Sequence, residues 1–334
     1  MTPRPRRSVS APAFRWFALA SFLSMIVIVL TGAAVRLTGS GLGCPDWPTC
    51  FGDRITGSWS IHPLIEYTNR MVTIALVCVT IVTFLAALRR EPRRADLITL
   101  SGALIGGVVA DAVLGGFVVY SKLNPWLVSL HLLFSLAMVA IGATLYHHSK
   151  YLYGPGARSD VRDPGFKRVA RVLWFPFVAL VMSGTVATGA GPHAGSSVGQ
   201  VRAQRLPIAL IDATWIHSAA AVLFIGLVTG LLLAVWWTDA PRPLKLGVRR
   251  LVAVSLAQAA IGVTQYATHL PAALVELHVA GAVSLTIGMT QFNLRQTARD
   301  REPGIDRPGT RAARLHPPGP LGPSAVTTDA ALRG

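Results

Sequence analysis

Eight apolar segments dominate this sequence, and each is long enough to cross a lipid bilayer. A membrane-spanning helix needs about 20 predominantly apolar residues. The segments that satisfy this requirement are 14–36, 64–88, 97–120, 126–148, 169–190, 209–237, 248–268 and 272–292. Only 14% of the residues are charged, whereas a soluble domain carries roughly 25%. The sequence therefore predicts an all-α integral membrane protein with eight transmembrane helices.

The placement of the basic residues predicts how the chain is oriented in the bilayer. A net charge of +16 could by itself indicate nucleic-acid binding. Lys and Arg instead gather in the N-terminal segment and after the second, fourth, sixth and eighth apolar segments. Cytoplasmic loops of membrane proteins are enriched in these residues. We therefore expect a multi-pass plasma-membrane protein with both termini in the cytoplasm, the loop 37–61 outside, and no nucleic-acid partner.

The two halves of the sequence repeat. Asp111-Ala-Val-Leu-Gly-Gly resembles Gln258-Ala-Ala-Ile-Gly-Val, and Val128-Ser-Leu-His131 resembles Val275-Glu-Leu-His278. An even number of helices in each half inserts both halves the same way, so a pseudo-two-fold axis should run along the membrane normal. The expected parts are a cytoplasmic N-terminal segment (1–13), an N-terminal four-helix bundle (14–148), a cytoplasmic linker (149–168), a C-terminal four-helix bundle (169–292) and a tail (293–334). The tail is rich in Pro, Gly, Arg and Ala, and we expect it to be disordered.

Three histidines lie within apolar segments at similar depth. His131 and His278 occupy matching positions in the two halves, and His217 lies in the upper part of the sixth segment. A single histidine in a membrane could simply form a hydrogen bond to a neighbouring helix. Imidazole is also a usual axial ligand of haem iron, and a four-helix bundle can hold a haem between facing helices. The three together favour haem ligands, with one haem in each half.

The partner ligand in the N-terminal half is less obvious. The repeat aligns Asn69 with His217, and asparagine is a poor haem ligand. His62 is the nearby alternative. Pro63 suits the first position of a helix, which would make His62 the N-cap residue. His62 could then either approach the haem from above or only cap the helix, and both interpretations stay open.

An acidic residue stands at the outer end of the second apolar segment. Glu66 shares one helical face with His62 and Asn69. It could form an ion pair with Arg70, four residues further on, or accept a proton beside a haem. Arg70 could equally hold a haem propionate. Because acids inside a membrane are usually functional, we predict a catalytic role for Glu66.

A second acid, Asp111, lies deeper, in the third apolar segment. The repeat aligns it with the neutral residue Gln258. A functional role and a structural polar contact are therefore equally compatible with its position.

Cys44 and Cys50 flank a Pro-Asp-Trp-Pro sequence in the expected outer loop. The oxidising exterior of a cell permits a disulfide there, although an exposed pair could exchange electrons with a thiol partner. We predict a disulfide that is either structural or redox-active. Cys78, in the second apolar segment, should be buried and only pack.

Several motifs resemble the haem A synthase family. They are Leu37-Thr-Gly-Ser-Gly-Leu-Gly-Cys-Pro-Asp-Trp-Pro48, Ile65-Glu-Tyr-Thr-Asn-Arg70, Leu123-Asn-Pro-Trp126 with His131 following, Thr188-Gly-Ala-Gly-Pro-His193 and Trp215-Ile-His217. The resemblance covers about residues 14–292 and excludes the tail. The high Arg, Ala and Gly content is similar to that of actinobacterial members.

The resemblance implies an activity, which is oxidation of the C8 methyl group of haem O to the formyl group of haem A, the cofactor of cytochrome oxidase. Water would supply the oxygen atom. His131 would ligate the substrate haem in the N-terminal half, beside Glu66 as the catalytic acid. His217 and His278 would ligate a haem b in the C-terminal half. An unidentified electron acceptor is implied, and docking of a haem O synthase to deliver the substrate stays open.

This sequence departs from the family pattern at two places. The commoner Glu-Tyr-x-His-Arg motif has Asn69 in place of the histidine, so the substrate haem would be held by His131 alone or together with His62. Some members also carry a second cysteine pair in the loop after the fifth helix, where this chain has Gly191-Pro-His-Ala-Gly195. A mechanism that needs the second pair cannot apply here.

Two other functions remain compatible with the residues alone. A non-catalytic haem b protein could carry electrons across the bilayer, and it would not need Glu66. A transporter could also be built from duplicated helices with charges inside the membrane, and it would bind no haem tightly.

Overall fold

The computed structural model describes residues 8–53, 59–152, 159–161, 164–196 and 203–299. Within these residues eight helices are long and apolar enough to cross a membrane, which confirms the predicted helical membrane protein. The first seven residues and the tail from residue 300 onward lie outside the described residues. The predictions for those parts of the N-terminal segment and the tail therefore stay predictions.

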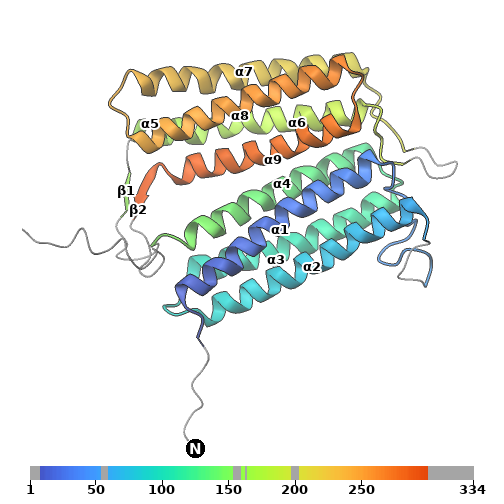
Figure 1. The fold of residues 1–334 in the computed structure, drawn as a ribbon, viewed down its shortest axis with the longest axis horizontal. Coiled ribbons are helices and arrows are strands. Elements are labelled where there is room, and N and C mark those ends of the chain that lie inside the picture. The colour runs from blue at the N-terminus through green and yellow to red at the C-terminus, as the bar shows by residue number, and fades with distance from the viewer. Residues whose placement is uncertain (1–7, 54–58, 153–158, 162–163, 197–202, 300–334) are drawn as a thin grey trace, which may run out of the picture.

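The N-terminal half is a closed bundle of four helices. These are α1 (Ala11–Leu37), α2 (Ile61–Arg89), α3 (Ala95–Tyr120) and α4 (Pro125–His148). Each helix packs against the next, and α4 returns to pack against α1. Their shared core includes Phe14, Phe22, Leu104 and Val139. Figure 1 shows this bundle in blue and green.

The C-terminal half repeats the arrangement with one interruption. Its helices are α5 (Pro164–Val172), α6 (Trp174–Ala190), α7 (Leu210–Trp236), α8 (Arg242–Ala267) and α9 (Ala272–Leu294). The fifth predicted segment is broken between α5 and α6 at Leu173. Pro176 explains the break, because proline has no N–H to donate to the carbonyl four residues earlier. The core of this half includes Phe177, Phe224 and Met289.

The two bundles meet as a pseudo-two-fold relation requires. Helix α4 packs against α9, which is its counterpart in the other half. Helix α1 also packs against α9, and its counterpart α6 packs in the same way against α4. Figure 1 shows all the long helices running in nearly the same direction across both bundles. The halves differ in one respect, since α1 and α4 pack along each other whereas α6 and α9 make little direct contact. The C-terminal bundle is therefore the more open of the two.

Several helices begin earlier than hydropathy predicts, and the starts of α8 and α2 differ in ways that matter. Helix α8 starts at Arg242 instead of residue 248, with Pro243 in its first turn, where proline is well tolerated. Helix α2 starts at Ile61, so Ser60 is the N-cap residue and Pro63 is the third helical residue. His62 is therefore the second helical residue, and of its two open interpretations the one as N-cap residue is excluded, because Ser60 occupies the cap position with an extended backbone.

A short antiparallel pair of strands joins the linker to the end of the last helix. Strand β1 (Ser159–Val161) pairs with β2 (Thr297–Arg299). Residues 293–299 were expected to begin a disordered tail, and that prediction is wrong, because α9 continues to Leu294 and β2 follows. These strands lie at the end of the molecule where the described N-terminal residues also lie (Figure 1). Cys78 is exposed on α2 and not buried as predicted; the bilayer offers an apolar environment to outward-facing residues as well.

Loops at the opposite end connect the halves directly. The Gly41 backbone N–H donates a hydrogen bond to the carbonyl oxygen of Gly195 at 2.8 Å. A Cβ atom on Gly41 would lie 2.9 Å from that oxygen, so a larger residue there must displace the contact. Arg36 Nε donates to the carbonyl of His193 at 2.9 Å, and Nη2 donates to the carbonyl of Thr188 at 3.1 Å. The end of α1 and the loop after it are therefore joined to the end of α6 and the loop after it, and these contacts hold the two bundles together.

We predict that Arg36→Met destabilises the protein by about 1.5–3 kcal/mol, because hydrogen bonds from a charged donor contribute about this much. Thermal unfolding in detergent should show a lower midpoint. Arg205→Met is the matched control, since Arg205 is exposed and donates to one carbonyl at the surface. Equal midpoints for the two variants would contradict the structural role of Arg36.

Candidate functional site

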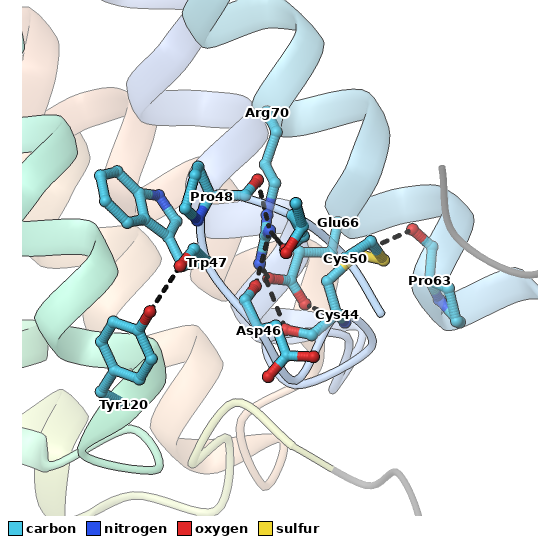
Figure 2. A network of polar contacts seen from close by, with 10 residues as sticks. Cys44, Asp46, Trp47, Pro48, Cys50, Pro63, Glu66, Arg70 and Tyr120 are labelled. Carbon is cyan, nitrogen blue, oxygen red and sulfur yellow. Dashed lines mark hydrogen bonds and ion pairs between the residues drawn. A yellow bond between two sulfur atoms is a disulfide. The ribbon is translucent and has the colours of Figure 1, made fainter. Parts of the chain in front are cut away.

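Glu66 lies buried in the second turn of α2, with only 5% of its surface exposed. Its Oε1 atom accepts a hydrogen bond from Arg70 Nη2 at 2.6 Å. Its Oε2 atom accepts one from the backbone N–H of Cys44 at 2.8 Å. Both carboxylate oxygens therefore have partners, and the ion pair with Arg70, one of the two roles left open for Glu66, is present (Figure 2).

Arg70 holds the outer loop against α2. Its Nη1 atom donates to the carbonyls of Asp46 at 2.8 Å and Thr49 at 2.7 Å, and Nη2 donates to the carbonyl of Cys44 at 3.2 Å. Figure 2 shows the guanidinium surrounded by these loop oxygens and by Glu66. A haem propionate would have to share this crowded group, and the predicted contact between Arg70 and haem stays a prediction.

The predicted disulfide between Cys44 and Cys50 is present, and it closes the loop around Arg70. Both cysteines are fully buried. Gly52 N–H donates to Asp46 Oδ2 at 2.7 Å and fixes the turn inside the loop. Because the disulfide joins the two ends of the segment whose carbonyls bind Arg70, it helps to hold Glu66 in place.

The same loop also contacts α3. Tyr120 Oη donates to the carbonyl of Trp47 at 2.5 Å, as Figure 2 shows. The Trp47 ring covers Gly116, where a Cβ atom would lie 2.8 Å from the ring. The loop therefore bridges α2 and α3 and covers the outer end of the N-terminal bundle.

His62 and Asn69 contact other parts of the N-terminal half. His62 Nδ1 lies 3.0 Å from Ser40 Oγ, and its backbone lies so close to Gly43 that a Cβ atom there would be 2.6 Å from the carbonyl of His62. Asn69 Oδ1 accepts a hydrogen bond from Thr31 Oγ1 at 2.7 Å. Asn69 thus ties α2 to α1, and His62 ties α2 to the start of the outer loop.

His131 is positioned by the start of α4. Asn124 is the N-cap residue, and its side chain accepts a hydrogen bond from the backbone N–H of Trp126 at 3.0 Å. Pro125 begins the helix, so His131 lies nearly two turns below its outer end. His131 Nδ1 lies 2.7 Å from Asp111 Oδ1 on α3, and 39% of the His131 side chain is exposed.

The structure brings His217 and His278 together in the C-terminal half. Their ring centroids are 6.1 Å apart and the rings are nearly perpendicular. Ser183 Oγ lies 3.2 Å from His217 Nδ1. Bonds from imidazole nitrogen to a metal are about 2 Å long. Two such bonds, together with the distance from each bonding nitrogen to the centre of its ring, add up to about the observed distance between the ring centroids. The arrangement fits one metal ion bound by both rings.

The two histidines line a cavity of about 550 Å³ between α4, α6, α7, α8 and α9. The lining is largely apolar and includes Leu132, Leu136 and Val279. Cofactor sites are typically apolar cavities of about 300–1,000 Å³ with a few polar groups. The cavity lies where α6 and α9 do not pack against each other, and its size and lining fit a porphyrin.

Each of the three membrane histidines lies against a glycine of a neighbouring helix. A Cβ atom would lie 3.4 Å from the ring of His131 at Gly115, 3.0 Å from the ring of His217 at Gly184, and 3.4 Å from the ring of His278 at Gly262. Sequence reasoning missed these glycines. The repeat could have indicated two of them, because Gly115 and Gly262 each precede their histidine by 16 residues.

We predict that Arg70→Gln makes the Cys44–Cys50 disulfide reducible under mild conditions. The loop would lose the hydrogen bonds from Arg70 to its carbonyl groups. Losing about 1.5–3 kcal/mol of stabilisation raises the fraction of molecules in which the loop is open roughly tenfold or more. The measurement is thiol alkylation followed by mass spectrometry after a brief treatment with reductant. Arg89→Gln, at the exposed far end of α2, is the control. Equal labelling of both variants would show that Arg70 does not hold the loop closed.

Comparisons with known proteins agree with this arrangement. The COX15-CtaA family, described as cytochrome oxidase assembly protein, matches residues 15–290. Proteins named heme A synthase are similar over shorter stretches. The one from Lysinibacillus sphaericus (strain C3-41) is 32% identical over 133 residues, which is 39% of this chain and 42% of the relative. The one from Staphylococcus saprophyticus is 24% identical over 177 residues, which is 53% of this chain and 57% of the relative.

The matched region spans about half the length of these curated relatives, whereas the family match covers most of the chain. That match includes the outer loop, the Glu66–Arg70 pair and all three membrane histidines. The predicted relationship is thereby confirmed, and the chain belongs to the COX15-CtaA family of cytochrome oxidase assembly proteins.

Proposed function

We propose that this chain is a haem A synthase, an oxidoreductase that converts the C8 methyl group of haem O to a formyl group with water as the oxygen source. The observation that carries the proposal is the convergence of His217 and His278 on one porphyrin-sized cavity in a chain of this family. The relatives named heme A synthase support the same activity. The product would serve cytochrome oxidase.

In the C-terminal half, His217 and His278 would hold a haem b. Ser183 orients the His217 ring through Nδ1, and the glycines at 184 and 262 let both rings lie close to their neighbouring helices. When bound, the haem b supplies a centre for one-electron transfer. The lining around this centre would be largely apolar.

In the N-terminal half, His131 would hold haem O as the substrate. Asn69 is bonded to Thr31, which supports a structural role for it and leaves His131 as the principal ligand. His62, tied to Ser40 through Nδ1, is the tentative second ligand. The substrate iron would thus have fewer histidine ligands than the haem b iron.

Glu66 would be the catalytic residue that takes up protons. Conversion of a methyl group and water to a formyl group releases protons and electrons, so the reaction needs a proton acceptor and an electron acceptor. Arg70 and the Cys44 N–H hold the carboxylate that would accept a proton. The electrons would pass to an acceptor outside this chain.

The proposed setting is the plasma membrane, with the disulfide loop outside and both termini in the cytoplasm. The basic clusters after α2 and α4 lie at the end of the bundle where the described termini lie (Figure 1), which agrees with the preference of Lys and Arg for the cytoplasmic side. A haem O synthase is the proposed source of substrate, since haem O is too apolar to diffuse freely through water.

Glu66→Gln should lower haem A formation at least 100-fold, because a positioned proton acceptor typically contributes 10²–10⁴-fold to the rate. Haem A would be measured by chromatography with mass detection in a host that makes haem O but lacks its own haem A synthase. Asp212→Asn, which changes an exposed acid in α7, is the matched control and should retain full activity.

Two other outcomes would revise the proposal. Haem A from both variants would keep the enzyme but remove Glu66 from its mechanism. If the unaltered chain yields only haem b although haem O is supplied, the result would instead favour a non-catalytic electron carrier that binds haem b. The His217–His278 pair would suit such a carrier equally well.

Gly184→Ala should weaken haem b binding about tenfold. Changes to the groups that support a metal ligand typically lower metal affinity about 10–100-fold, and this prediction is the lower end of that range. The new Cβ atom would lie 3.0 Å from the His217 ring and displace it. The pyridine haemochrome assay of purified protein gives the haem content. Gly226→Ala is the control, since a Cβ atom there meets nothing within 4 Å. Full haem content in Gly184→Ala would argue against His217 as a ligand.

A further inference from the structure

Asp111 is a membrane acid that the proposed function leaves unused. It lies in the middle of α3, and only 15% of its side chain is exposed. Its two oxygen atoms are directed at α4, where Oδ2 accepts a hydrogen bond from Ser135 Oγ at 2.5 Å and Oδ1 lies 2.7 Å from His131 Nδ1. A carboxylate at this depth is costly and persists where it has a partner and a use.

The contact with His131 is close but not yet aligned as a hydrogen bond. The distance is short, whereas the direction of the imidazole N–H leaves both atoms outside the usual hydrogen-bond geometry. Functional hydrogen bonds are often misaligned before a ligand binds and tighten once it is present.

The C-terminal half lacks this contact. The residue aligned with Asp111 is Gln258, whose side chain extends over Gly281 of α9 so closely that a Cβ atom there would overlap it. The N-terminal counterpart of Gly281 is Phe134, which offers no such space. His278 Nδ1 is buried without a hydrogen-bond partner among the described residues. The carboxylate partner is therefore specific to His131.

The two halves also differ in their membrane histidines: the half without the carboxylate contact has two close together, and the half with it has one. His217 and His278 face each other in the C-terminal half, whereas Asn69 occupies the position aligned with His217 in the N-terminal half and is bonded to Thr31. Among His131, His217 and His278, the histidine that has a carboxylate neighbour is thus the one that lacks an aligned histidine partner. A carboxylate at the far nitrogen of an imidazole fixes its tautomer and makes it a stronger metal ligand.

We propose that Asp111 is a positioning residue for the substrate haem: it orients His131 through Nδ1 and strengthens Nε2 as the ligand of an iron porphyrin that has one principal protein ligand. This inference rests on the proposed function, because it assumes that His131 binds the substrate. Asp111 itself does not touch the haem. Gly115 lets α3 pass close to the His131 ring, since a Cβ atom there would lie 3.4 Å from Cε1 and 3.7 Å from Nε2.

The test is binding of haem O to purified protein that already carries haem b, followed by absorbance. Asp111→Asn keeps the shape of the side chain and removes its charge, and it should weaken haem O binding about 10–100-fold, the usual effect of losing such a partner. Ser135→Ala is the matched control, because it removes the other partner of Asp111 and leaves the contact with His131 in place. It should bind haem O nearly as tightly as the unaltered chain.

Resonance Raman spectroscopy of the ferrous haem O complex distinguishes positioning from mere packing. The iron–histidine stretching frequency should fall in Asp111→Asn, since the imidazole loses its anionic partner, and it should be unchanged in Ser135→Ala. Retention of haem b by each variant reports that the bundle has folded. Asp111→Ala provides a second variant with the same expected direction.

The outcomes separate the inference from the function on which it rests. Equal affinity and an equal stretching frequency in Asp111→Asn, with haem b retained, would overturn the role of Asp111 and leave the synthase proposal intact. Failure of the unaltered chain to bind haem O at all would overturn both. Loss of haem b together with haem O in both Asp111 variants would show a structural role and would also overturn the inference.

Discussion

The buried ion pair between Glu66 and Arg70 organises the outer face of the N-terminal bundle. A charged pair at the end of a membrane helix is stable only if its remaining hydrogen-bonding capacity is satisfied. The loop supplies this by directing four backbone carbonyls at Arg70 and the backbone N–H of Cys44 at Glu66. The disulfide holds the loop in the shape that makes these contacts possible. Loop, disulfide and acid are therefore one unit.

The repeated architecture places two similar bundles side by side and lets them diverge. Helices α4 and α9 form the centre of the contact between the halves. Closure of α1 on α4 makes the N-terminal bundle compact, while the separation of α6 from α9 leaves a cavity beside His217 and His278. The paired histidines suit a resident cofactor, whereas the single His131 with its carboxylate neighbour suits a haem that must be exchanged. In the proposed function, the repeated scaffold would thus provide both a permanent site and a substrate site.

Hydropathy was sufficient to predict the helices, because a chain within a bilayer must satisfy its backbone hydrogen bonds internally. The repeat predicted that His131 and His278 are equivalent, and the spacing of four residues made the Glu66–Arg70 pair one of two open interpretations. The carbonyl groups around Arg70 were not predictable, since they depend on how a loop folds and not on side-chain identity. Nor was the close approach of Asp111 to His131, because the register between α3 and α4 is set by packing. Cys78 was misplaced for a related reason, as apolar character cannot distinguish a residue facing lipid from one facing the core.

The most direct test of the account is the identity of the haem that the chain yields in a membrane supplied with haem O and free of any other haem A synthase. The account predicts that haem extracted from the purified protein contains haem b together with haem A. Detection of haem b with unaltered haem O, in folded protein with an electron acceptor present, would contradict the proposed reaction. The histidine pair and its cavity would then describe a haem protein whose task is electron transfer alone.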